Sequence, residues 1–224
     1  MFRHITARPV VGLVTLALLC AAFALAPLRA DEEAAFETVT PAVLSEDDAR
    51  WLQRAEDYFN SIESIRAAFF QTAEGEVAEG VFYLSRPGRL RVEYLPPTPV
   101  LIVGDGLFLH FHDTELGQVS DWPIFDTPLG ALSSDEVKFN EDLIVTGFRR
   151  RSGSLAITLV KSEDPGLGSL TLFFGEAPME LKQWKVIDAQ GLVTTVALFD
   201  AELNIALDNR LFVFDDPREA RHDR

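Results

Sequence analysis

Cysteine is nearly absent from this 224-residue sequence, and the one cysteine, Cys20, lies inside an apolar run near the N-terminus. A single thiol excludes an intrachain disulfide framework and a metal site built from cysteines. Sequence signatures of catalysis are missing as well, because the chain has no P-loop, GxGxxG motif, EF-hand loop or Ser-His-Asp signature. We therefore expect neither an enzyme nor a bound cofactor.

Basic residues are also few, with 20 Lys and Arg against 35 Asp and Glu, which gives a formal charge of −15. A chain with this charge repels phosphate backbones and anionic membrane surfaces. We therefore expect no nucleic-acid partner. The length of the chain suits one domain with a sizeable core.

The N-terminal segment has the pattern of a secretory leader. Two arginines and no acidic residue precede the 17-residue run VVGLVTLALLCAAFALA, and PLRA follows, with Ala30 as the expected last residue before cleavage. A retained anchor helix is the alternative, but it needs about 20 apolar residues. A lipoprotein leader is disfavoured because Leu19, before Cys20, is large. Removal of residues 1–30 would take away three arginines and Cys20, leaving 194 residues, a charge of −18 and no cysteine nucleophile.

Two histidines invite a metal-site interpretation. His110 and His112 share one face of an expected strand, but a zinc site normally needs a third protein ligand and an oriented second shell. Asp113 would point to the opposite face, so we expect strand histidines near a wet rim and no metal. The basic trio Arg149 to Arg151 is expected to be solvated at a hairpin tip, with a docking surface as the alternative.

A helix is predicted near the start of the exported chain. Residues 31–44 are acidic and lack periodicity, which is typical of a disordered lead-in. Ser45, with Asp48 three residues later, resembles a capping box. Apolar residues then recur at helical spacing, at Leu52, Ala55, Phe59 and Ile62. Two strand-like segments around Gly75 follow.

The stretch GVFYLSRPGRLRVEY, Gly80 to Tyr94, predicts a β-hairpin that turns at Pro87-Gly88. A three-residue loop, Pro87 to Arg89, would pair Phe82 with Tyr94, Leu84 with Val92 and Arg86 with Leu90. This register gives one apolar face. Arg86 would then lie at the hairpin end of the apolar row, with its stem buried and its head in water.

The next two strand candidates are apolar on both faces. They are Val100 to Val103, which includes Ile102, and Leu107 to His112, joined by the hairpin signal Asp105-Gly106. An antiparallel sheet with one wet face should alternate instead. The sheet is therefore expected to be covered on two sides here, or to present one face to an apolar ligand.

Residues 121–140, DWPIFDTPLGALSSDEVKFN, interrupt the strand pattern with two prolines. We predict one or two short helices and loops here, a lid instead of a strand. The large apolar side chains expected to pack it are Trp122, Ile124, Phe125, Leu129 and Leu132. Strand patterns then resume as LIVTGF, LAITLV, SLTLFF, LKQWKVID, VTTVALF, LNIAL and LFVF, without crossover helices, which predicts an antiparallel meander of about ten strands. Residues 218–224 are expected to be a solvated tail.

The order of these features resembles the periplasmic outer-membrane lipoprotein carrier family, LolA, over roughly residues 45–217. The resemblance is carried by G-x-F-x-L-x-R-P at Gly80 to Pro87, LIVGDGLFL from Leu101, TPLGAL from Thr127 and LKQWKVIDAQG from Leu181. It implies a mainly β fold with helices (α+β), an incomplete antiparallel barrel. Its concave apolar face would be covered by the N-terminal helix and the lid at 121–140.

The resemblance also implies a function. Such a monomeric carrier takes triacylated lipoproteins from an inner-membrane ABC transporter complex and passes them to an outer-membrane acceptor. By this resemblance Arg86 becomes a latch on the lid, and Val92 stands where the family often has Trp. The apolar interior falls on Phe82, Leu84, Leu90, Val92, Tyr94 and Ile102. The alternatives are a carrier of another lipid, such as a glycolipid or phospholipid, and a lipoprotein-sensing regulator.

Overall fold

The computed structural model describes residues 39–127, 130, 132–139, 141 and 143–218 of the chain. The expected leader therefore lies outside the described residues. Within those residues, no helix combines the length and the apolar character needed to cross a bilayer.

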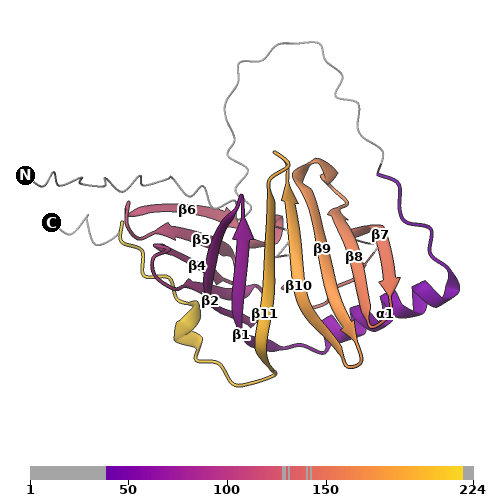
Figure 1. The fold of residues 1–224 in the computed structure, drawn as a ribbon. Helices are drawn as coiled ribbons and strands as arrows, with labels where there is room; N and C mark the ends of the chain where they lie inside the picture. The colour runs from indigo at the N-terminus through magenta and orange to yellow at the C-terminus, as the bar shows by residue number, and fades with distance from the viewer. Residues whose placement is uncertain (1–38, 128–129, 131, 140, 142, 219–224) are drawn as a thin grey trace, which may run out of the picture.

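In the described part of the chain, the fold is one open antiparallel sheet of eleven strands, with helix α1 packed against it (Figure 1). The strand order is β6-β5-β4-β3-β2-β1-β11-β10-β9-β8-β7, so β6 and β7 are the two edges and do not close the sheet into a barrel. The elements are α1 Glu46–Asn60, β1 Ser64–Ala73, β2 Glu76–Ser85, β3 Arg89–Tyr94, β4 Val100–Asp105, β5 Phe108–Asp113, β6 Gln118–Pro123, β7 Leu143–Arg151, β8 Ser154–Lys161, β9 Gly168–Glu176, β10 Met179–Asp188 and β11 Val193–Leu203. The short 3-10 helices among the described residues are η1 Ile124–Asp126, η2 Pro165–Leu167 and η3 Asn209–Phe212. The expected mainly β, unclosed architecture is confirmed.

Helix α1 begins where the sequence predicts. The Ser45 hydroxyl accepts a hydrogen bond from the Asp48 amide at 3.1 Å, which satisfies one of the free amides of the first turn. The predicted apolar stripe is buried and packs on the sheet. The Phe59 ring lies 5.7 Å from that of Phe174 on β9, and the Tyr58 hydroxyl accepts from the Leu181 amide of β10 at 3.2 Å.

The β2–β3 hairpin forms, but its predicted register is wrong by two residues. Phe82 pairs with Val92 and Leu84 with Leu90, so the three loop residues are 86 to 88 and not 87 to 89. A slip of two residues keeps every side chain on the same face, and apolar alternation therefore does not distinguish the two registers. In the observed register Arg86 is a loop residue and has no strand partner.

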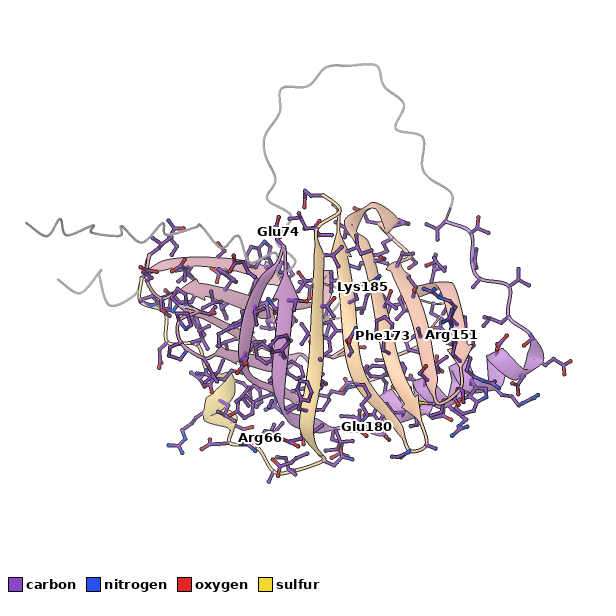
Figure 2. All side chains as sticks on the ribbon, in the orientation of Figure 1. Arg66, Glu74, Arg151, Phe173, Glu180 and Lys185 are labelled. Atoms are coloured by element: carbon purple, nitrogen blue, oxygen red, sulfur yellow. The ribbon has the colours of Figure 1, made fainter. Side chains whose placement is uncertain are left out.

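One face of the sheet is largely apolar from β8 to β5, and we call it the inner face. Cross-strand partners share a face, so the face can be followed from Leu155 on β8 through Phe174, Leu181 and the strands between to Leu109 on β5. Helix α1 covers part of it. Figure 2 views the opposite, outer face, where Phe173 and Lys185 lie.

The outer face of β3 to β5 is covered by the C-terminal segment, residues 205–218. Phe212 of η3 is buried there, and Val103 beneath this segment is fully buried. The Arg91 guanidinium donates to the Leu211 carbonyl at 3.1 Å. The strands that are apolar on both faces are therefore covered on both faces, which was the first of the two expectations. The predicted strands LNIAL and LFVF are wrong, because β11 ends at Leu203 and the segment beyond it lies across the sheet.

Candidate functional site: an apolar face and its lid

All six side chains predicted to line the apolar interior lie on the inner face of β2, β3 and β4. None is more than 9% exposed; they are Phe82, Leu84, Leu90, Val92, Tyr94 and Ile102. The sequence did not single out Trp184 of β10. Its ring meets that of Phe82 edge-on at 5.6 Å, which adds aromatic volume to the same surface.

The lid, residues 124–139, begins one element later than predicted. Trp122 is a residue of edge strand β6, paired with Leu109, and not a lid residue. The strand extends because residues 118–123 continue the hairpin started by β5, and Pro123 closes it at an edge, where proline is tolerated. Leu129, also predicted for the lid, lies outside the described residues.

Ile124 anchors the lid on the sheet. Its side chain is fully buried, and it lies where a Cβ on Gly104 would come within 2.7 Å of its Cδ1. The absent side chain of this β4 glycine is therefore the space that Ile124 fills. Leu132 is buried as well, whereas Phe125 is 42% exposed.

Short polar side chains fold the lid on itself. The Thr127 hydroxyl donates to the Ile124 carbonyl at 2.7 Å and accepts from the Gly130 amide at 2.9 Å. The Ser133 hydroxyl donates to the Gly130 carbonyl at 2.6 Å. These bonds leave the carbonyls of Leu132 and Ser133 free to meet the β2–β3 loop.

The Arg86 side chain reaches the lid. Its Nη2 donates to the Leu132 carbonyl at 2.7 Å, and the nearby Gly88 amide donates to the Ser133 carbonyl at 2.9 Å. Among the described residues, the buried Nε and Nη1 of Arg86 have no hydrogen-bond partner. Burial lowers the pKa of Arg86, and the charge of Asp135 opposes that shift. The guanidinium is therefore half-buried against the lid and not extended into water.

A second set of contacts, which the sequence did not reveal, holds the far end of the lid to α1. The Asn60 amide group donates to the Val137 carbonyl at 3.0 Å, and its carbonyl oxygen accepts from the Val137 amide at 2.8 Å. The Glu56 carboxylate accepts from the Phe139 amide at 2.7 Å. In the sequence, the apolar residues Val137 and Phe139 of the segment EVKFN could have indicated this contact, and both are buried.

A cavity of 580 Å³ lies beside the lid. It is bounded by Pro87 and Phe125 on one side, by residues 134–138 of the lid, and by Leu143 and residues 161–163 at the ends of β7 and β8. Its volume is within the range of small-molecule pockets, about 300–1,000 Å³. The lid therefore borders open space on the side that faces edge strand β7.

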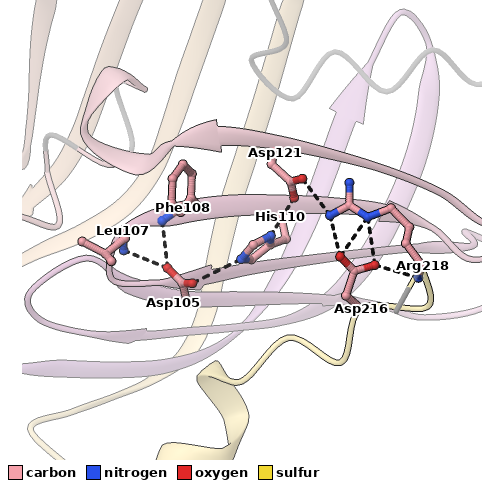
Figure 3. Close-up of polar contacts among 7 residues, drawn as sticks. All are labelled: Asp105, Leu107, Phe108, His110, Asp121, Asp216 and Arg218. Carbon is pink, nitrogen blue, oxygen red and sulfur yellow. Dashed lines mark hydrogen bonds and ion pairs between the residues drawn. The ribbon is translucent and has the colours of Figure 1, made fainter. Parts of the chain in front are cut away.

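His110 belongs to a polar cluster on the outer face (Figure 3), and the His112 ring meets Phe214 edge-on beside it. His110 contacts Asp121 through Nδ1 at 2.7 Å and Asp105 through Nε2 at 3.3 Å, and its ring stacks on Phe214 at 4.6 Å. Within the described part of the chain, no group of three potential metal ligands occurs. In the basic trio, Arg150 pairs with Asp47 and so ties the start of α1 to β7.

Comparisons with known proteins identify the family of this chain. The family model "Outer membrane lipoprotein carrier protein LolA" matches residues 60–215. Outer-membrane lipoprotein carrier proteins of Pseudomonas paraeruginosa and Methylobacillus flagellatus are 29% and 30% identical, over 76% and 73% of this chain and 86% and 83% of theirs. A solved LolA superfamily protein from Nitrosomonas europaea gives a TM-score of 0.42 at 9% identity, covering 72% of this chain and 97% of that one. With a family model spanning more than half of its residues, this chain belongs to the LolA family of outer-membrane lipoprotein carrier proteins.

Proposed function

We propose that this protein shields the acyl chains of triacylated lipoproteins on its inner face and moves them from the inner to the outer membrane. LolA family proteins are periplasmic carriers and not enzymes. The observation that carries the proposal is the largely apolar inner face, which helix α1 and a small lid cover. In this proposal the donor is an inner-membrane ABC transporter complex and the recipient an outer-membrane acceptor.

The physical requirement for such a carrier is large. Each CH₂ group of an acyl chain is worth about 0.8 kcal/mol when buried, so a triacylated anchor does not cross an aqueous compartment unprotected. The carrier must also hide its own apolar face when empty, because soluble monomers rarely expose patches beyond a few hundred Å². Helix α1 and the lid meet that second requirement, since the inner-face side chains are buried beneath them.

The contacts that hold the lid suit reversible closure. The lid accepts one hydrogen bond each from Arg86 and Gly88, makes three with Asn60 and Glu56 of α1 at its far end, and buries the side chain of Ile124. A bond to a charged group contributes about 1.5–3 kcal/mol. Arg86 therefore acts in this proposal as a latch that biases the lid towards closure and that cargo overcomes by binding the inner face.

The test uses protein purified from the periplasmic fraction and inner-membrane vesicles that carry a triacylated lipoprotein. We expect soluble 1:1 complexes with the acylated cargo and none with the same protein lacking its lipidated cysteine. Equal recovery of both forms would overturn the proposal. Mass spectrometry of the bound lipids would show glycolipid or phospholipid instead if the chain carries another lipid.

A further inference from the structure

Gln71 places a polar group on the inner face. It lies on β1 in the same row as Phe69 and Ala67, and it is only 2% exposed. The other described polar residues with buried side chains are small hydroxyl residues, and none of the buried residues described is charged. An amide is therefore unusual at this position, because a methionine or leucine would fill it without the cost of removing a polar group from water.

The amide is only partly satisfied. The Tyr94 hydroxyl of β3 donates to Gln71 Oε1 at 2.9 Å, while the buried Gln71 Nε2 has no acceptor among the described residues. Rotating the amide by 180° would let Nε2 donate to the tyrosine oxygen, but the second amide hydrogen would still lack an acceptor. Either orientation leaves a buried donor without a partner, which is costly in an apolar environment.

The surroundings of this pair restrict which kind of acceptor the Gln71 Nε2 group would bind. The Phe69 ring meets that of Tyr94 edge-on at 5.2 Å, in the space left by the missing side chain of Gly80. Burial raises the pKa of Tyr94, so its hydroxyl stays neutral. Without a neighbouring buried cation, the pair suits a neutral carbonyl oxygen better than a phosphate or a carboxylate.

The distance from Gln71 to the lid fits an acyl chain. Gln71 lies six residue steps after Ile65, whose partner Leu84 lies just before the loop that holds the lid. At about 3.3 Å per residue this is about 20 Å of apolar strand. One leaflet of a membrane's hydrocarbon core, about 15 Å, is of similar length. Figure 2 shows the two ends of β1, with Glu74 near the Gln71 end and Arg66 near the lid end.

We propose that Gln71, positioned by Tyr94, donates a hydrogen bond to the ester carbonyl of an acylglycerol group bound on the inner face. The inference rests on the proposed lipid-carrying function and adds a polar recognition site to it. The ester carbonyl lies at the β1–β2 turn end of the inner face, and the hydrocarbon chain runs towards the lid. The site thus fixes the depth at which the glyceryl group is held.

The experiment compares dipalmitoylglycerol with its dialkyl ether analogue, dihexadecylglycerol, which lacks both carbonyls. Each competes with a fluorescent acyl probe for the full periplasmic protein, its Gln71→Met and Tyr94→Phe variants, and a control. Gln183→Met is the control, because it makes the same substitution on the outer face, beside Phe173. Wild type and control should prefer the ester about three- to tenfold, as one neutral hydrogen bond allows. Gln71→Met should lower this preference to about one, and Tyr94→Phe should reduce it.

The outcomes separate the two proposals. Equal binding of ester and ether by wild type, or an ester preference that survives Gln71→Met, overturns the carbonyl site and leaves lipid carriage standing. If the wild-type protein binds neither lipid, the proposed carrier function is overturned as well. Thermal unfolding gives a second readout. The empty Gln71→Met, Tyr94→Phe double variant should melt no lower than wild type, because it removes the unpaired Gln71 donor and leaves no Tyr94 hydroxyl without an acceptor, and a marked fall in its Tm would contradict the proposal.

Discussion

Replacing Arg86 by alanine tests the latch at the loop where it contacts the lid. The side chain gives the Leu132 carbonyl one hydrogen bond, which contributes about 1.5–3 kcal/mol to the closed state. Burial of the unpartnered Nε and Nη1 opposes this gain, because each buried donor without a partner costs about 1–3 kcal/mol. With about 3 kcal/mol gained and about 1 kcal/mol lost at each nitrogen, the net bias from Arg86 is about 1 kcal/mol, a closed-to-open ratio near 5 to 1.

Removing this bias should tighten the binding of acyl ligands. A ligand that binds only the open protein has its affinity reduced by the open fraction, so Arg86→Ala should lower the apparent Kd about three- to sixfold. Titration with a fluorescent hexadecanoyl probe measures the Kd, and stopped-flow transfer to liposomes should show slower release.

Arg86→Lys is the matched control, because it keeps the charge and one donor for the same carbonyl. Its Kd should lie between those of wild type and Arg86→Ala. The reasoning is refuted if Arg86→Ala folds normally yet binds and releases the probe at wild-type values.

Three other predictions concern the lid, the C-terminal segment and pH. Gly104→Ala should destabilise the closed lid by about 1–3 kcal/mol, because a Cβ there meets a lid side chain at 2.7 Å. Binding of a hydrophobic dye should rise in this variant, whereas Gly175→Ala, where the added Cβ makes ordinary contacts, should leave dye binding unchanged. Phe212→Ala should cost about 3 kcal/mol in urea unfolding, since it empties a buried site over β3 and β4, and a loss below 1 kcal/mol would argue against that packing. The hydrogen bond from Arg218 lowers the pKa of Asp216 in the folded protein. The ionised carboxylate therefore stabilises the fold fully above its unfolded pKa of about 3.9, and this stabilisation is lost as the pH falls through the lower folded pKa. Asp216→Asn should therefore flatten the fall in the urea midpoint between pH 5 and pH 2, and an unchanged slope would count against the pair.

Much of the architecture follows from local patterns in the sequence. Ser45 with Asp48 marks the helix start, Gly75 and Asp105 mark hairpins, and the parity of residues 82 to 94 identifies the inner face. These features depend on neighbours in the chain, which the sequence displays directly.

The errors arise where distant segments decide the structure. Alternation does not resolve a two-residue slip, so the register that places Arg86 in the loop was missed. Residues 205–214 alternate like strands, yet they lie across the outer face of the sheet, where Phe212 is buried and η3 packs on β3 and β4. Gln71 and Asn60 gain their contacts from partners 23 and 77 residues away, and neither spacing leaves a sequence motif.

Photocrosslinking from the inner face in living cells tests the central claim most directly. A photoreactive phenylalanine analogue at position 82 should crosslink triacylated lipoproteins and lose them when the cargo's lipidated cysteine is replaced. The same analogue at Phe199, which is 53% exposed on the outer face, should not capture acyl chains. Equal capture from both positions, or capture of unlipidated cargo at Phe82, would contradict the account.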